Sequence, residues 1–154
     1  MTIKEKLSAE AYACGVDVID WRFNSDRIKG LYCDGTIVLS NRLSDTEGGS
    51  VLAEELGHHM MTAGNILDQN DVGNRQQELK ARMWGYNRLI GLRGIADAFD
   101  HGCRNRYEVA DYLGVTEEFL KKALEAYRAK YGCCAKIDNY LIRFIPHLDV
   151  VRML

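Results

Sequence analysis

The sequence predicts an α+β fold, in which a small antiparallel β-sheet packs on a helical core and a helix-turn-helix-like segment follows. Three observations predict it. The stretch LYCDGTIVLS holds two β-like runs joined at Asp34-Gly35, a strong signal for a two-residue hairpin. Two later segments repeat apolar residues at helical spacing. Between residues 105 and 132, a glycine and a threonine divide two further helical stretches.

The first forty residues are expected to supply one helix and the sheet. Residues 2–14 carry apolar side chains at the spacing of one helical face, namely Ile3, Leu7, Ala11 and Cys14. The stretch GVDVIDWRF, residues 15–23, alternates in the manner of a strand. Together with the hairpin, this strand predicts a small antiparallel sheet.

Two long helices are expected in the middle of the chain. Ser44 and Glu47 have the spacing of a capping box, and apolar residues then recur at helical spacing up to a natural stop at Gly64. The pair Gly48-Gly49 leaves the start of this helix open. After the polar stretch NILDQNDVGN, a second helix is expected from about residue 75 to residue 91. Its apolar stripe comprises Leu79, Met83, Tyr86 and Ile90.

The C-terminal third is predicted to begin with a helix-turn-helix-like pair. Gly114 ends the first helix, and Thr116 is placed to cap the second, whose first turn carries Glu117 and Glu118. Carboxylates at that position repel DNA phosphates, so DNA binding is not expected. The tail, residues 133–154, is apolar and β-branched and is expected to add an edge strand or a packed arm.

Composition limits the classes of function. The chain has 154 residues, which suits one domain, and its net charge of −2 lacks the basic excess of a nucleic-acid-binding protein. No apolar run is long enough for a membrane span, and the N-terminus has no signal-peptide core, so a cytoplasmic protein is expected. The five cysteines form no C-x-x-C pair and are interpreted as reduced thiols.

The stretch EELGHH, residues 54–59, has the spacing of a metal site on a helix. Residues four apart lie on one helical face, so Glu54 and His58 can bind one ion while Glu55 reaches a water molecule on it. Glu55 and His59 have the same spacing, and spacing alone does not separate the two frames. An ordinary solvated helix face with a Glu–His contact is the alternative to both.

The surrounding order of motifs resembles the ImmA/IrrE family of metallopeptidases, in which an H-E-L-G-H helix is followed by a helix of pattern E-x-x-A-x-x-aromatic-small. Glu78, Ala81, Trp84 and Gly85 reproduce the second pattern, with glycine where alanine is usual. The hairpin before the first helix is also similar. The resemblance covers about residues 28 to 95, and E-E-L-G-H resembles a phage-associated variant of the family.

The resemblance implies a site and an activity. It selects Glu54, His58 and Glu78 as metal ligands and Glu55 as the catalytic base, because Gly57 fixes that frame. It implies Zn²⁺, with Mn²⁺ or Fe²⁺ as alternatives, and cleavage of a helix-turn-helix repressor of a prophage or other mobile element. A degenerate repressor-binding protein is the second possibility, and a DNA-binding helix-turn-helix protein is a third and less favoured one. The metallopeptidase-like core is expected to span residues 1–100. The helix-turn-helix-like helices and the C-terminal arm are expected to span residues 101–154 and to pack on the core as one domain.

Other polar residues are weaker candidates. Tyr86, His101 and Tyr107 are candidates for oxyanion support by residue type alone, and packing or surface roles are the alternative for each. His59 is interpreted as a supporting or surface residue and His147 as structural.

Overall fold

The computed structural model describes residues 1–61 and 71–153. The predicted helix stop at Gly64 lies outside them, as do residues 65–70 of the predicted polar loop. The chain divides into two compact units, residues 1–85 and 86–154, and the boundary falls within one helix. The division after residue 100 expected from the sequence stays a prediction. Each unit is described here by itself.

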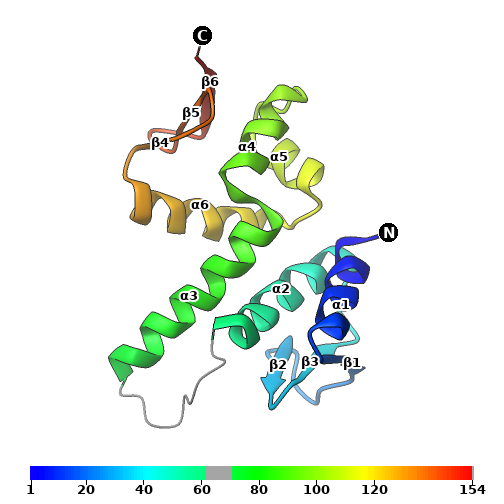
Figure 1. The fold of residues 1–154 in the computed structure, drawn as a ribbon. Helices are drawn as coiled ribbons and strands as arrows, with labels where there is room; N and C mark the ends of the chain where they lie inside the picture. Colours follow the sequence, from blue (N-terminus) through cyan, green and yellow to red (C-terminus); the bar gives the residue numbers. More distant parts are fainter. Residues whose placement is uncertain (62–70, 154) are drawn as a thin grey trace. The chain divides into compact units, whose positions relative to one another are not determined.

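The first unit combines helices with a three-stranded sheet (Figure 1). Its elements are α1 (Ile3–Ala13), β1 (Asp17–Trp21), β2 (Gly30–Cys33), β3 (Thr36–Ser40), α2 (Asp45–Met61) and most of α3 (Asp71–Leu89). The α+β class predicted from the sequence is confirmed.

The sheet has the order β1-β3-β2. The predicted hairpin is confirmed: β2 and β3 pair antiparallel, and both Asp34 (φ 46°) and Gly35 (φ 81°) have the positive φ that a tight hairpin turn of this kind requires. The antiparallel expectation is wrong for β1, which pairs parallel with β3. The consecutive strands β1 and β2 do run in opposite directions, but β3 lies between them.

One face of this sheet is covered by α1 and α2, which lie on the same side of it in Figure 1. Ile37 and Leu39 of β3 point to this face and are fully buried. Leu7 of α1 and Leu52 and Leu56 of α2 complete the apolar interior. The catalytic helix candidate, α2, is therefore fixed directly to the sheet.

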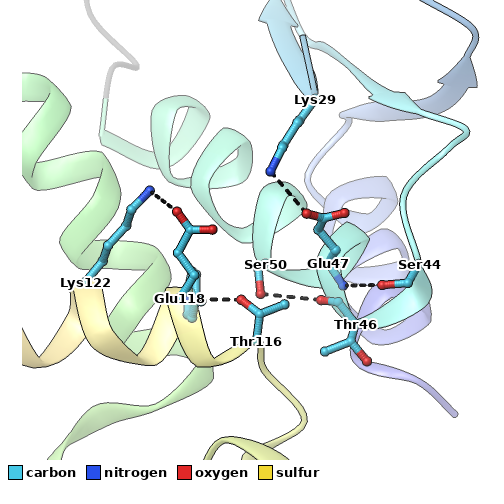
Figure 2. A network of polar contacts seen from close by, with 9 residues as sticks. Lys29, Ser44, Thr46, Glu47, Ser50, Thr116, Glu118 and Lys122 are labelled. Carbon is cyan, nitrogen blue, oxygen red and sulfur yellow. Dashed lines mark hydrogen bonds and ion pairs between the residues drawn. The ribbon is translucent and has the colours of Figure 1, made fainter. Parts of the chain in front are cut away.

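The start of α2 is defined by the predicted cap (Figure 2). The Ser44 hydroxyl accepts the Glu47 N–H at 3.1 Å, and the Glu47 carboxylate forms an ion pair with Lys29 at 3.1 Å. Gly48 and Gly49 lie inside the helix and are buried. A Cβ on Gly49 would lie 3.1 Å from the Ile3 side chain, so these glycines allow α1 to pack closely.

The second long helix, α3, begins at Asp71, earlier than expected. Its predicted apolar stripe is only partly right: Tyr86 and Ile90 are buried, whereas Leu79 is 64% exposed. The reason is that α3 meets α2 through the small residues Ala81 and Gly85, which define a different and narrower contact face.

The second unit begins with the last turn of α3 and continues through three helices and a second sheet. These are α4 (Gly91–Asp100), α5 (Arg106–Leu113), α6 (Glu117–Tyr131), β4 (Cys134–Ile137), β5 (Tyr140–Arg143) and β6 (Asp149–Arg152). Helix α4 was not predicted, although Ile95, Ala96 and Phe99 have helical spacing and are buried. None of the described helices is both long and apolar enough to cross a membrane.

The predicted boundary between the two helices of the helix-turn-helix-like segment is confirmed. Gly114, with φ 72°, ends α5, and the Thr116 hydroxyl accepts the Phe119 N–H at 3.0 Å at the start of α6 (Figure 2). The tail was predicted as one edge strand or a packed arm. Instead β4, β5 and β6 form an antiparallel sheet of their own, because two short turns divide the apolar run.

Candidate functional site

The predicted site residues Glu54, Glu55 and His58 all lie on α2, in the half that follows the buried residues Leu52 and Ala53. All three site side chains are of intermediate exposure. Because α2 is fixed to the sheet on one side, these residues occupy the margin between the apolar interior and solvent. Side chains at such a margin are held in place and still reach water.

A close crossing of α2 and α3 brings the fourth predicted residue, Glu78, to the others. A Cβ built on Gly57 would lie 2.1 Å from the Ala81 carbonyl oxygen, and one on Gly85 would lie 3.1 Å from the Ala53 carbonyl oxygen. The absent side chain at Gly57 is therefore a condition for this approach. The glycine of the E-E-L-G-H motif has a packing role between the helices.

The crossing places His58 and Glu78 in direct contact. The His58 Nε2 and Glu78 Oε2 atoms are 3.0 Å apart, and the second Glu78 oxygen accepts from the Arg82 Nε at 3.0 Å. Two protein ligands of one tetrahedral zinc ion lie about 3.3 Å apart, given bonds of about 2.05 Å. An imidazole nitrogen and a carboxylate oxygen at this separation fit two positions around one metal ion.

Glu55 lies beside this pair and has a perturbed acidity. Burial raises the pKa of the Glu55 carboxyl above its usual value, the nearby His58 lowers it, and the carboxylates of Glu54 and Glu78 raise it. The net shift is upward. A raised pKa makes this carboxylate a better proton acceptor than an ordinary surface glutamate.

Glu55 also faces the sheet. A Cβ on Gly30, at the start of β2, would lie 3.4 Å from the Glu55 Cγ and 2.7 Å from the Val51 side chain. A side chain at residue 30 would collide with Val51, so glycine allows β2 to approach α2 closely here. The edge strand β2 therefore passes directly next to the candidate base.

The adjacent histidine, His59, has a different partner. Its Nδ1 is 2.8 Å from the Tyr32 hydroxyl, and the two rings meet edge to face with centroids 5.6 Å apart. Consecutive residues on a helix point about 100° apart, which is why His58 meets α3 while His59 meets β2. Tyr32 was not identified from the sequence, since nothing local links a hairpin residue to a histidine 27 positions later.

The fit of the donors to a metal ion is incomplete in one respect. Across residues 1–61 and 71–153, no group of three or more His, Cys, Asp or Glu side chains is arranged to hold an ion. Two of the proposed ligands, His58 and Glu78, fit by distance and by chemistry. Glu54 is adjacent to Glu55 on the helix, and its negative charge raises the pKa of Glu55. It does not form a group of three metal donors with His58 and Glu78 in the described part of the chain.

The remaining candidates belong to the second unit. The Tyr86 ring packs edge to face on Phe119 and is buried, and the His101 ring stacks on Tyr112. Tyr107 is 65% exposed. These contacts are consistent with packing and surface roles.

The comparison with known families matches residues 11–125 to Peptidase_M78, described as the IrrE N-terminal-like domain. The match covers well over half of the chain and includes every residue of the candidate site. No curated protein matches the sequence. The family match confirms the ImmA/IrrE resemblance, while the E-E-L-G-H variant type and the phage association stay predictions.

Proposed function

Because the chain belongs to the M78 peptidase family with its IrrE N-terminal-like domain, we propose that it is a metal-dependent endopeptidase using Glu55 as its base. The single observation that supports this most is the 3.0 Å contact between His58 and Glu78, from two different helices, beside a glutamate of raised pKa.

The family implies a metal cofactor, which Glu54, His58 and Glu78 would hold. When bound, a divalent ion supplies Lewis-acid polarisation of a carbonyl and lowers the pKa of a coordinated water. His58 contributes a nitrogen and the two glutamates contribute oxygens, all of which zinc accepts. We favour Zn²⁺, with Mn²⁺ or Fe²⁺ as alternatives because two oxygen donors improve the relative affinity for harder ions.

Glu55 would take the proton from the attacking water and pass it to the leaving amine. Its partial burial keeps the carboxylate poorly solvated, which raises its pKa and its basicity. The absent side chain at Gly30 lets β2 pack closely against α2 beside Glu55. His58 contacts Glu78, whereas His59 contacts Tyr32, which supports the frame of Glu54, Glu55 and His58 over that of Glu55 and His59.

Glu54 distinguishes this chain from an H-E-L-G-H site. Two glutamate ligands would formally neutralise a divalent ion, whereas a His/His/Glu set leaves one positive charge. A less positive site acidifies its water less. A basic Glu55 therefore matters more here than in a site with two histidines.

The proposed substrate is a helix-turn-helix repressor of a phage or other mobile element, which would make the protein an anti-repressor. This assignment rests on the family resemblance. The helix-turn-helix-like pair α5 and α6 would contact protein and not DNA, because α6 begins with Glu117 and Glu118, which would face phosphates.

A catalytically inactive protein that grips the same repressor is the second candidate. It is favoured by Glu54 at the first ligand position and by the missing three-donor group in the described part of the chain. Both candidates predict repressor binding, so cleavage is the property that separates them.

The test is cleavage of a purified helix-turn-helix repressor of a phage or mobile element, with Zn²⁺, Mn²⁺ or Fe²⁺ added in turn. Wild type should cleave, and Glu55→Gln should lower the rate by about 100-fold or more because the amide keeps its shape and cannot accept a proton. Glu5→Gln, an exposed glutamate on α1, is the matched control and should cleave normally. Binding without cleavage by wild type with every metal would favour the inactive candidate.

A further inference from the structure

The outer edge of β1 is a feature of the first unit that the proposed function does not use. β3 pairs with one side of β1, and in the part of the chain that the structure describes no strand pairs with the other side. A hollow runs along this edge, lined by α1 and β1 residues that include Tyr12 and Ile19. Such an edge offers N–H and C=O groups at the spacing that another strand needs.

The backbone of β1 directs Val18 and Asp20 toward this open edge. Asp17 donates its N–H to the residue before β3 at 3.1 Å, and Trp21 accepts an N–H from the residue after β3 at 3.0 Å. In a parallel pair, each residue directs both polar groups to one side and its neighbours direct theirs to the other. The odd-numbered residues of β1 therefore face β3, and the two even-numbered residues face outward.

Two large apolar side chains of β1 are exposed on one face of the sheet. Ile19 is 46% exposed and Trp21 is 60% exposed, and both lie on the sheet face opposite to the buried Ile37 and Leu39. Tyr12 of α1 is 80% exposed. β1 holds no proline or lysine to block pairing, and of its two charged residues, Asp17 and Asp20, Asp20 is paired with Lys4.

We propose that two copies of the chain pair through β1, antiparallel and related by a two-fold axis at Ile19. In this register Val18 of each copy lies opposite Asp20 of the other, and each such pair exchanges two backbone hydrogen bonds. The outward N–H and C=O groups of all four residues are then satisfied. The two Ile19 side chains meet at the axis as a close, non-hydrogen-bonded pair.

The neighbouring two-fold registers are disfavoured by charge and by backbone pairing. An axis at Asp20 would set two aspartates directly opposite each other, which is repulsive. An axis at Val18 would set Asp20 opposite Val16, whose N–H is already donated to the Ala11 carbonyl at 2.8 Å. With the axis at Ile19, Asp20 faces an apolar residue, and its charge is balanced by Lys4 at 3.1 Å in its own chain. A second copy is therefore a self-complementary occupant of this edge.

An edge contact between five-residue strands lies below the usual size of a stable interface, so the dimer should form at micromolar concentrations. Sedimentation velocity over a dilution series from about 200 µM to about 1 µM covers that range. Wild type should shift from dimer to monomer within it.

Ile19→Lys and Ile19→Glu each place like charges opposite each other at the axis and should both be monomeric at every concentration. An equimolar mixture of the two variants should restore the dimer, because lysine then faces glutamate. Leu31→Lys is the matched control: Leu31 is 49% exposed on the same sheet face but lies on β2, the other edge, so this variant should dimerise like wild type. Circular dichroism checks that all three variants fold.

The proposal is overturned if wild type is monomeric throughout, whether or not a strand of another protein then binds this edge. It is also overturned if Leu31→Lys dissociates the dimer as Ile19→Lys does, or if the mixture of charged variants stays monomeric.

Discussion

Substituting Gly57 by alanine tests whether the close crossing of α2 and α3 holds the site together. The new Cβ would lie 2.1 Å from the Ala81 carbonyl oxygen, whereas ordinary van der Waals contact begins at 3.4 Å, so the two must separate by 3.4 − 2.1 = 1.3 Å. The obstructing atom is backbone and cannot rotate away. Overpacking costs about 1–3 kcal/mol, and a clash with rigid backbone takes the upper end, about 3 kcal/mol, of which alanine returns about 1 kcal/mol in helix propensity. We expect a net loss of roughly 2 kcal/mol.

Gly85→Ala is the matched control for this change. Its Cβ would lie 3.1 Å from the Ala53 carbonyl oxygen, which needs a shift of only a few tenths of an ångström. The gain in helix propensity should offset that strain, leaving stability within about 1 kcal/mol of wild type. Alanine is also the usual residue at this position of the motif that the second helix resembles.

Urea unfolding followed by circular dichroism measures both variants. Gly57→Ala should shift the midpoint well below wild type and reduce metal binding, because His58 and Glu78 move apart with the helices. If Gly57→Ala were as stable as wild type, or if Gly85→Ala were the more damaging change, the crossing would not be limited by Gly57.

Three further predictions concern the site. Glu55→Gln should stabilise the fold at neutral pH and not at acid pH, because the pKa of Glu55 is raised in the folded state and its ionisation opposes folding as pH rises through the folded pKa. The measurement is the difference in urea midpoint between variant and wild type at a series of pH values, and a difference that does not change with pH would contradict this prediction. Glu54→His should retain metal and move the acid limb of the pH–rate profile to lower pH, because it removes a negative charge beside Glu55 and from the ligand set. Glu54→Ala should lose metal, and equal metal content in both variants would show that Glu54 is not a ligand. Tyr32→Phe removes the 2.8 Å contact with His59 and should cost about 1 kcal/mol without changing cleavage, and a loss of cleavage would assign His59 to the site.

Helix caps and turns were predictable from the sequence, because each depends only on hydrogen bonds or backbone angles of residues a few positions apart. Ser44 and Thr116 cap helices as predicted, because an N-cap hydroxyl needs only a backbone N–H three residues away. The turn at Asp34-Gly35 was predictable for the same reason, since both residues adopt positive φ. These signals located the boundaries of α2, α6 and the β2–β3 hairpin.

Long-range contacts were not predictable in the same way. The pairing of β1 with β3 depends on where the chain returns after residues 22–29, and no local pattern encodes this. Leu79 has the right spacing for a buried stripe and is exposed, because Ala81 and Gly85 form the contact with α2. The Tyr32–His59 contact joins two elements whose approach only the packed fold defines.

For the candidate site, the sequence predicted the contact between His58 and Glu78 only through the family resemblance. Helical spacing relates Glu54 to His58, but it is silent on a residue from another helix. The structure brings His58 to Glu78 at 3.0 Å and Glu55 beside them, while the ligand role of Glu54 stays a prediction.

The measurement that tests the metallopeptidase proposal most directly is the metal content of the purified full-length chain, determined by elemental analysis after purification without chelators. We expect about one transition-metal ion per chain, most readily zinc, and a sharp loss of it in Glu78→Ala, because a three-ligand site loses one of its donors. Glu118→Ala, an exposed glutamate paired with Lys122, should keep the wild-type content. A wild-type chain that holds no metal after addition of Zn²⁺, Mn²⁺ or Fe²⁺, or a Glu78→Ala chain that holds as much as wild type, would contradict the proposed site.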